Sequence, residues 1–198
     1  MNRPELSEEN LELIQKKAES YKIKKLCRLT KSKKLLILDL DHTLINDKWD
    51  DYIPLQRPFL HDLLKGVYKN YNIATESPMS RIMEVLGEMR MTNHKDYRKA
   101  VVKVKDSEGS WDRCKPLRII WHELREFGPE NTIIIDDIRE NFLMNPQSGL
   151  AIRKFNNQKN DEELKKLAKY LKKISSRGSF KNLEHSNWEK LSKIIDQC

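Results

Sequence analysis

The chain has 198 residues and a formal net charge of +8, and 34% of its residues are charged. This length suits one domain with a core of its own, and no apolar run is long enough to predict a membrane span or a secretory signal. The positive charge favours acidic partners such as phosphate groups, acidic peptides or nucleic acid, and three widely separated cysteines favour unpaired thiols over zinc or disulfide sites.

The first element is an amphipathic helix, predicted over residues 7–26 with Ser7 as its N-cap. Residues 22–34 contain seven Lys or Arg residues, and we interpret them as a solvated linker rather than as a localisation signal or an anion-binding patch. We therefore expect residues 1–30 to form an N-terminal helix and linker. Residues 31–198 should form one domain that includes the C-terminal helices.

Two uninterrupted apolar runs, residues 35–38 and 132–135, predict strands that are buried on both faces of a parallel sheet. Between them, helical patterns begin at Pro58 and cover residues 79–86. A further strand is predicted at residues 100–104, where β-branched residues gather.

Residues 71–74 form a weaker strand pattern, and residues 119–127 fit either a strand end or a helix. Helices are predicted at residues 161–174 and 188–195. This order predicts an α/β fold with a Rossmann-like, mostly parallel central sheet flanked by helices, a small inserted β region and a helical C-terminal tail.

Carboxylates follow both buried runs: Asp39 and Asp41 come after the first, and Asp136 and Asp137 after the second. Buried carboxylates are unfavourable without a cation or hydrogen-bond donors, and parallel sheets bind ligands at the carboxyl ends of their strands. Each pair alone is typical of a turn or a helix cap. Together they favour a metal–phosphate site, in which one carboxylate attacks phosphorus and a second transfers a proton.

Magnesium is the ion that this donor set predicts, because it prefers oxygen ligands and usually keeps water and phosphate oxygens. We expect carboxylate ligands from Asp39 and Asp136, and the backbone carbonyl of Asp41 as a third ligand. A bound cation would offset the repulsion between the attacking carboxylate and the phosphate dianion.

Three segments resemble the FCP-homology phosphatase domain of the haloacid-dehalogenase superfamily: LLILDLDHTLI, KPLRIIW and TIIIDDIRENFLMNPQSGL. Within that family the chain is most similar to the CTD phosphatases that contain a ubiquitin-like domain. The resemblance begins at the helix SEENLELIQKKAESYKI, so we expect the ubiquitin-like domain itself to be absent. It implies a haloacid-dehalogenase fold and a phosphatase activity.

The resemblance also implies roles for individual residues. Asp39 matches the nucleophile, and Asp41 matches the general acid and base. Thr43 matches a hydroxyl that supports this loop, and Asp136 matches the acidic metal ligand.

Lys115 matches the lysine that balances the charge of the phosphate and Asp39, and Asp137 matches a residue that acts through water or this lysine. Thr75 is the match for a hydroxyl that binds the phosphoryl group, with Ser77 as the alternative. The strand before Thr75 is predicted to be about two residues shorter than in the family, and Glu76 places an acid beside the expected phosphate site. Residues 101–114 also depart from the family pattern.

By resemblance we expect a Mg²⁺-dependent protein serine/threonine phosphatase that forms an aspartyl-phosphate. Its expected substrates are phosphorylated nuclear proteasome subunits or, second, the RNA polymerase II tail, and the proteasome regulatory particle is a candidate partner. We expect a monomer located in the nucleus, with the cytoplasm as a further location. One alternative is an impaired pseudophosphatase that binds phosphoproteins. The other, a basic nucleic-acid-binding protein, is disfavoured because the sequence contains no nucleic-acid motif.

Overall fold

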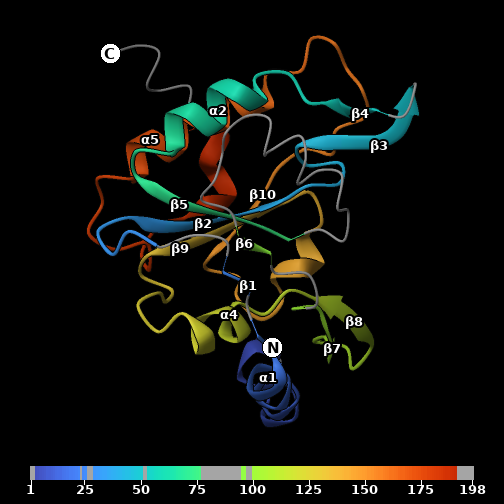
Figure 1. Ribbon diagram of the computed structural model, residues 1–198. Coiled ribbons are helices and arrows are strands. Elements are labelled where there is room, and N and C mark those ends of the chain that lie inside the picture. The colour runs from blue at the N-terminus through green and yellow to red at the C-terminus, as the bar shows by residue number, and fades with distance from the viewer. Residues whose placement is uncertain are drawn as a thin grey trace.

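A six-stranded sheet forms the centre of the protein, in the order β1-β6-β5-β2-β9-β10 (Figure 1). The computed structural model describes residues 3–22, 24–25, 29–50, 53–76, 95–96 and 100–190. The strands of the sheet are β1 (Lys24–Lys25), β2 (Lys34–Asp39), β5 (Tyr71–Glu76), β6 (Lys95–Asp96), β9 (Thr132–Asp136) and β10 (Gly149–Ala151). All neighbours pair in parallel except β1 and β6, so the predicted mostly parallel α/β sheet is confirmed.

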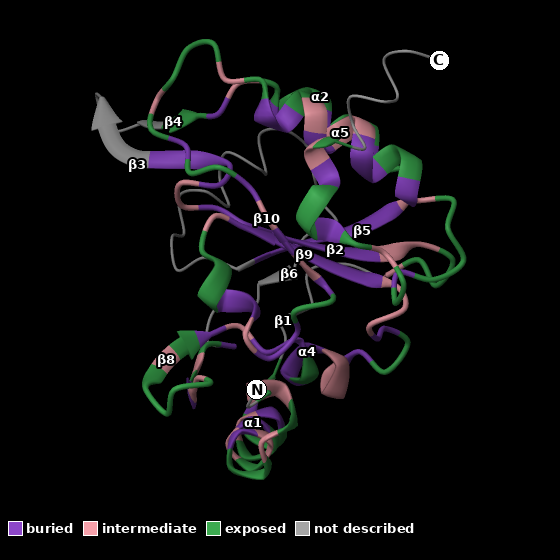
Figure 2. Cartoon of the chain, turned by 180° about the vertical axis from the view of Figure 1, so that it is seen from behind, coloured by how far each residue is buried: buried purple, intermediate pink, exposed green. Residues whose placement is uncertain are grey.

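Helices cover both faces of this sheet and give the protein two apolar cores (Figures 1 and 2). The helices are α1 (Glu8–Ser20), α2 (Leu60–Val67), α4 (Leu117–Glu123) and α5 (Glu163–Ile174). Along β2, Leu36 and Leu38 pack with α2 and α5, whereas Leu35 and Ile37 pack with α1 and α4. Strand side chains alternate between faces, so one continuous apolar run supplies both cores.

Two antiparallel hairpins and three short 3₁₀ helices complete the described elements. They are the hairpin of β3 (Ile45–Asp50) and β4 (Ile53–Gln56), the hairpin of β7 (Val102–Lys105) and β8 (Trp111–Cys114), and the 3₁₀ helices η1 (Pro4–Leu6), η2 (Arg139–Phe142) and η3 (His185–Asn187). No helix in the described ranges has the length and apolar character needed to cross a bilayer.

The prediction of a helix over residues 7–26 is wrong at its C-terminal end. The helix stops at Ser20, and Tyr21 is extended with its side chain buried in the core. The basic stretch is not all linker either, because Lys24–Lys25 pairs with β6 at the edge of the sheet. Ser7 occupies the predicted N-cap, but its side chain makes no capping hydrogen bond. Pairing and burial override the local helical pattern here.

The weak strand predicted at residues 71–74 is confirmed, and it continues for two more residues. That it is shorter than the corresponding strand of the family stays a prediction. β5 runs from Tyr71 to Glu76 and pairs with β2 along its whole length. Small and polar residues weaken the apolar pattern of β5 in the sequence, yet its position beside the buried β2 supplies the hydrogen bonds that extend it.

The remaining boundaries shift by a few residues. Helix α2 begins at Leu60, two residues after Pro58. Of the two alternatives for residues 119–127, the helix is correct, and this helix, α4, ends at Glu123. The predicted helix at residues 79–86 lies outside the described residues, as does the end of the helix predicted at 188–195. Cys114 is buried and lies outside any disulfide, as predicted, and the other two cysteines lie outside the described residues.

The N-terminal helix packs on the same core as the sheet. Its Ile14 and Ala18 belong to the apolar cluster that contains Leu117 of α4. The Asn10 side chain accepts a hydrogen bond from the backbone N–H of Lys105 and donates one to its carbonyl, both at 2.9 Å. The division of the chain at residue 30 stays a prediction.

Buried His185 should make folding sensitive to acid. Its Nδ1 lies 2.7 Å from the hydroxyl of Tyr170, and burial lowers the pKa of His185 from 6.5 to about 4. The folded-state pKa is below the unfolded one, so its contribution to stability is complete above about pH 6.5 and is lost as the pH falls towards 4.

We expect the free energy of unfolding to fall by about 2 kcal/mol more in wild type than in His185→Asn between pH 7 and pH 5. Urea titrations at both pH values measure this difference. His61→Asn, on the exposed face of α2, is the control and should follow wild type. An equal fall in wild type and His185→Asn would contradict the prediction.

Candidate active site

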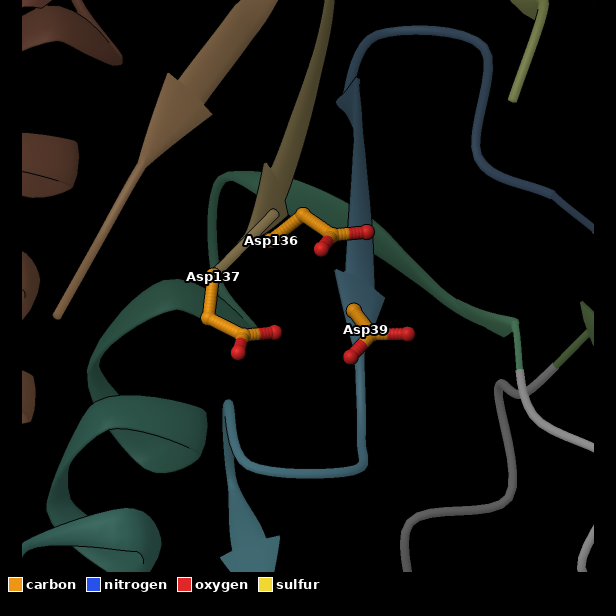
Figure 3. Close-up of side chains that lie close together, drawn as sticks. All are labelled: Asp39, Asp136 and Asp137. Carbon is orange, nitrogen blue, oxygen red and sulfur yellow. The ribbon is translucent and has the colours of Figure 1, made fainter. Parts of the chain in front are cut away.

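Two neighbouring strands end in carboxylates at one edge of the sheet. β2 ends at Asp39 and β9 ends at Asp136, and their register pairs Leu38 with Ile135. Figure 3 shows the side chains of Asp39, Asp136 and Asp137 gathered at these strand ends. Each offers a carboxylate oxygen within 4.8 Å of the other two. The sequence-based expectation that the two acidic pairs meet is therefore met for these three residues.

Lys115 joins the two strand ends. Its Nζ donates to Asp39 Oδ1 at 2.7 Å and to Asp136 Oδ2 at 2.9 Å. The residue follows β8, and its backbone N–H donates to the carbonyl of Asn141 at 3.0 Å. Lys115, which is 76 positions from Asp39 in the sequence, thus lies between two carboxylates that would otherwise repel each other.

Asp136 is fixed by two further donors. The Asn141 side chain donates to its Oδ2 at 2.8 Å, and the backbone N–H of Ile138 donates to its Oδ1 at 2.9 Å. With Lys115 these donors satisfy a carboxylate that is 1% exposed. Sequence reasoning missed Asn141, which is inside the quoted motif TIIIDDIRENFLMNPQSGL but has no spacing that signals a role.

The cluster carries more negative charge than Lys115 offsets. Burial raises the pKa of Asp39 from 3.8 to about 7, against the lowering effect of Lys115, and Asp136 raises it further. Burial and Asp136 also raise the pKa of Asp137. With all three carboxylates ionised (−3), the one ammonium (+1) would leave a formal charge of −2, and the raised pKa values show that this charge is unfavourable without a further cation. A divalent cation fits this oxygen donor set, because it matches both the ligand type and the excess charge.

The three clustered carboxylates and the three predicted metal ligands share two residues and differ in the third. Asp39 and Asp136 are common to both sets, but the structure groups Asp137 with them rather than the Asp41 carboxylate. Asp41 was expected to contribute its backbone carbonyl, and its backbone forms an isolated bridge with Ile45. The role of Asp41 as a ligand stays a prediction.

The loop between β2 and β3 is held in a tight turn. The backbone N–H groups of Leu44 and Ile45 donate to the carbonyl of Leu40 at 2.9 and 3.0 Å, and His42 adopts a left-handed conformation with φ of 60°. Thr43 is fully buried, and its hydroxyl donates to Asp137 Oδ1 at 3.3 Å. The supporting role predicted for Thr43 therefore has a geometric basis.

A buried arginine that is not part of this loop connects it to the rest of the fold. Arg57 Nη1 donates to the carbonyl of Thr43 at 2.9 Å, and its Nε and Nη2 donate to the two oxygens of Asp161 at 3.1 and 2.9 Å. Asp161 lies just before α5, so the pair ties the loop to a helix of the core. Sequence reasoning assigned no role to either residue, although Arg57 directly precedes Pro58, where a helix is predicted to begin.

Thr75 lies one register position before the carboxylates. It pairs with Leu38, while Glu76 pairs with Asp39. By strand alternation Thr75 shares the face of Tyr71 and Ile73, whereas Asp39 lies on the other face. Register alone therefore does not bring the buried Thr75 hydroxyl beside Asp39. Its phosphate-binding role stays a prediction, and the alternative, Ser77, lies outside the described residues.

Comparison with known proteins gives consistent matches. Residues 34–183 match the model of the family described as NLI interacting factor-like phosphatase. The chain is 38% identical over 202 residues to a protein of Arabidopsis thaliana named ubiquitin-like domain-containing CTD phosphatase. It is 37% identical over 207 residues to the corresponding phosphatase 1 of Danio rerio, and 37% over 199 residues to that of Homo sapiens.

These alignments cover nearly all of this chain and only part of each relative. They span 93%, 96% and 92% of the chain, but 59%, 65% and 63% of the relatives from Arabidopsis, Danio and Homo sapiens. The chain therefore corresponds to about three fifths of the length of the curated relatives it matches.

Removal of Arg57 should destabilise the fold strongly, because it leaves the Asp161 carboxylate without its main partner. We expect Arg57→Ala to lower the free energy of unfolding by about 3–5 kcal/mol, and the double variant Arg57→Met/Asp161→Leu to lose much less. Urea unfolding measures both.

The matched control is Arg118→Ala on the exposed face of α4, which should change stability by less than about 0.5 kcal/mol. A loss of under about 1 kcal/mol in Arg57→Ala would mean that the buried pair does not hold the loop.

Proposed function

Because this chain belongs to the NLI interacting factor-like phosphatase family, we propose that it hydrolyses phosphoserine or phosphothreonine in proteins through an aspartyl-phosphate on Asp39, with Mg²⁺ as cofactor. Family membership assigns it to the protein phosphatases. One observation supports the mechanism above all others: Lys115 bridges Asp39 and Asp136, with a third carboxylate within 4.8 Å.

In the proposed first step, a carboxylate oxygen of Asp39 attacks phosphorus in line with the substrate oxygen. The new bond is an acyl phosphate, and the bond between phosphorus and the serine or threonine oxygen breaks. Asp41 donates a proton to the leaving oxygen. Lys115 holds Asp39 in place and supplies positive charge beside the transferring group, which is where phosphoryl-transfer enzymes need it.

In the second step, Asp41 accepts a proton from a water molecule, which attacks phosphorus. The bond between phosphorus and the Asp39 oxygen breaks, inorganic phosphate leaves, and Asp39 returns as a carboxylate. Thr43 and Arg57 contribute indirectly, because their hydrogen bonds fix the loop that carries Asp41.

The donor set fits Mg²⁺. Asp39 and Asp136 would hold the ion, with Asp137 near it and the Asp41 carbonyl as the expected further ligand. When bound, the cation would offset the negative charge of the carboxylates and the phosphoryl oxygens.

The proposed substrates are phosphorylated proteins in the nucleus. The resemblance favours proteasome subunits, with the regulatory particle as a partner, ahead of the RNA polymerase II tail. The name of the relatives, CTD phosphatase, supports the second substrate. A phosphoproteomic comparison of nuclear extracts incubated with active and inactive protein would discriminate between the two.

One ground for the pseudophosphatase alternative, a shortened strand before Thr75, is weakened, because β5 pairs with β2 from Tyr71 to Glu76. The other ground, Glu76, pairs in register with Asp39, but its side chain is outside the described residues. Catalysis is therefore the better supported function.

We expect Mg²⁺-dependent hydrolysis of p-nitrophenyl phosphate, lost on addition of EDTA and reduced below detection in Asp39→Asn. The variant should stay folded, because it removes one of several like charges from a buried cluster. Circular dichroism checks the fold, and Asp62→Asn on the exposed face of α2 is the matched control. Full activity in Asp39→Asn would exclude the mechanism, and a folded, Mg²⁺-binding but inactive wild type would establish the pseudophosphatase.

Asp41→Asn should slow phosphoserine hydrolysis by about 10²–10⁴-fold, because an alkoxide leaves poorly without a proton donor. Formation of the acyl phosphate from p-nitrophenyl phosphate should be slowed less, since nitrophenolate needs no proton. Rapid-mixing kinetics would then show a burst of nitrophenolate before slow turnover. Equal slowing of both substrates in the first step would contradict the role of Asp41 as a general acid.

A further inference from the structure

The β7–β8 hairpin has one buried and one exposed face. Val104 and Cys114 are fully buried in the core shared with α1. The residues on the other side of the hairpin are mostly exposed (Figure 2). We call this side the β7–β8 face, and it consists of Val101, Lys103, Lys105, Trp111 and Arg113.

This face leads into the candidate active site. Trp111 and Arg113 are two positions apart on the same face of β8, and Lys115 follows two residues after Arg113. Lys115 is the residue that donates to Asp39 and Asp136. At the rise of an extended strand, Arg113 lies about 7 Å and Trp111 about 13 Å along the chain from Lys115. An extended peptide whose phosphoryl group lies at Lys115 can therefore reach both residues.

Two like charges face each other in the middle of this face. Lys103 and Arg113 are directly paired in the antiparallel register, and both are exposed. Cross-strand pairs of like charge destabilise a hairpin. This pair of cations lowers the stability of the hairpin, and local exceptions of this kind are expected at functional sites. The function that fits two adjacent cations is the binding of a negative group between them.

The aromatic residue of the face is held in position while half exposed. Trp111 is 51% exposed, and the Nζ of Lys105 lies 5.3 Å from its ring centroid. Lys105 Nζ also donates to Glu9 of α1 at 2.9 Å, so the cation that contacts the indole forms a surface ion pair with the N-terminal helix. Tryptophan and arginine are the residues most enriched in binding hot spots, and a positioned side chain loses little entropy on binding.

The turn of the hairpin is held by side-chain hydrogen bonds. At its tip, Asp106 Oδ1 accepts hydrogen bonds from the backbone N–H groups of Glu108 and Ser110, both at 2.8 Å. Gly109 supplies the left-handed conformation that the turn needs, with φ of 86°. These contacts hold the two strands of the binding face together at their turn.

We propose that the β7–β8 face binds acidic residues that flank the phosphorylated residue of a peptide substrate, about two to four positions away. The inference rests on the proposed function, because it assigns the phosphorylated residue to the site at Asp39 and Lys115. It adds a substrate preference: phosphoproteins with Asp, Glu or a second phosphate on that side of the target residue.

A peptide fits this face better than a nucleic acid does. The face has one aromatic ring for stacking, and acidic Asp106, Glu108 and Asp112 interrupt the positive charge on the same hairpin. Binding of single strands usually combines several aromatic platforms with a continuous basic groove.

Binding of labelled phosphoserine peptides to Asp39→Asn protein tests the proposal without turnover. One peptide carries Asp residues two and four positions from the phosphoserine, in separate versions on each side, and its partner carries Ala there. When the Asp residues lie on one side of the phosphoserine, we expect the acidic peptide to bind on the order of tenfold more tightly than its Ala partner. On the other side the two peptides should bind equally, and high salt should reduce the preference. Equal binding of all versions at low salt would overturn the proposal.

Lys103→Glu provides a sharper test, because it removes a binding cation and creates an opposite-charge pair with Arg113. It should raise the melting temperature and reduce the preference for the acidic peptide about threefold or more. Arg113→Glu should do the same, and Trp111→Ala should weaken binding of both peptides. The control, Lys172→Glu on the exposed side of α5, should leave the preference unchanged.

Other outcomes are equally decisive. An unchanged preference in both Lys103→Glu and Arg113→Glu would overturn the proposal. Tighter binding of a single-stranded RNA, lost in the same two variants, would overturn it in favour of a nucleic acid. If wild type fails to hydrolyse any phosphate ester but binds acidic phosphopeptides through this face, the binding inference stands while the proposed catalytic function fails.

Discussion

The bridge from Lys115 to Asp39 and Asp136 is the interaction on which the site depends. Two carboxylates at the ends of adjacent buried strands repel each other across a short distance in a poorly solvated edge of the sheet. The ammonium group between them makes this arrangement compatible with folding. It leaves an excess of negative charge, which is the condition for recruiting a divalent cation and, through it, a phosphate dianion.

Support for this bridge comes from elements on both sides of the sheet. On one side, Asn141 of η2 holds both the Asp136 carboxylate and the backbone of Lys115. On the other, Arg57 connects the loop after β2 to Asp161 before α5. The proposed catalytic residues are therefore held in place by Asn141 and Arg57, and such preorganisation is what electrostatic catalysis requires.

The β7–β8 hairpin combines two tasks that are physically linked. Its buried face packs on α1 and so fixes the strand that delivers Lys115. Its exposed face carries Arg113 and Trp111, two and four residues before the same lysine, so the proposed substrate contacts and the proposed catalytic lysine lie on one segment of the chain. The proposed substrate preference and the proposed catalysis then depend on a single element.

The sequence by itself determined the parallel core strands and the acids that end them, because uninterrupted apolar runs and the carboxylates that follow them are local patterns. The resemblance added the roles of Lys115, Thr43 and Asp137, which no local pattern indicates. Only the tertiary structure decided that β5 extends to Glu76, that the chain leaves the helix at Tyr21, and that Asn141 and Arg57 hold the site. These features depend on contacts between residues far apart in the chain, and hydrogen bonds of that kind leave no periodic signal in the sequence.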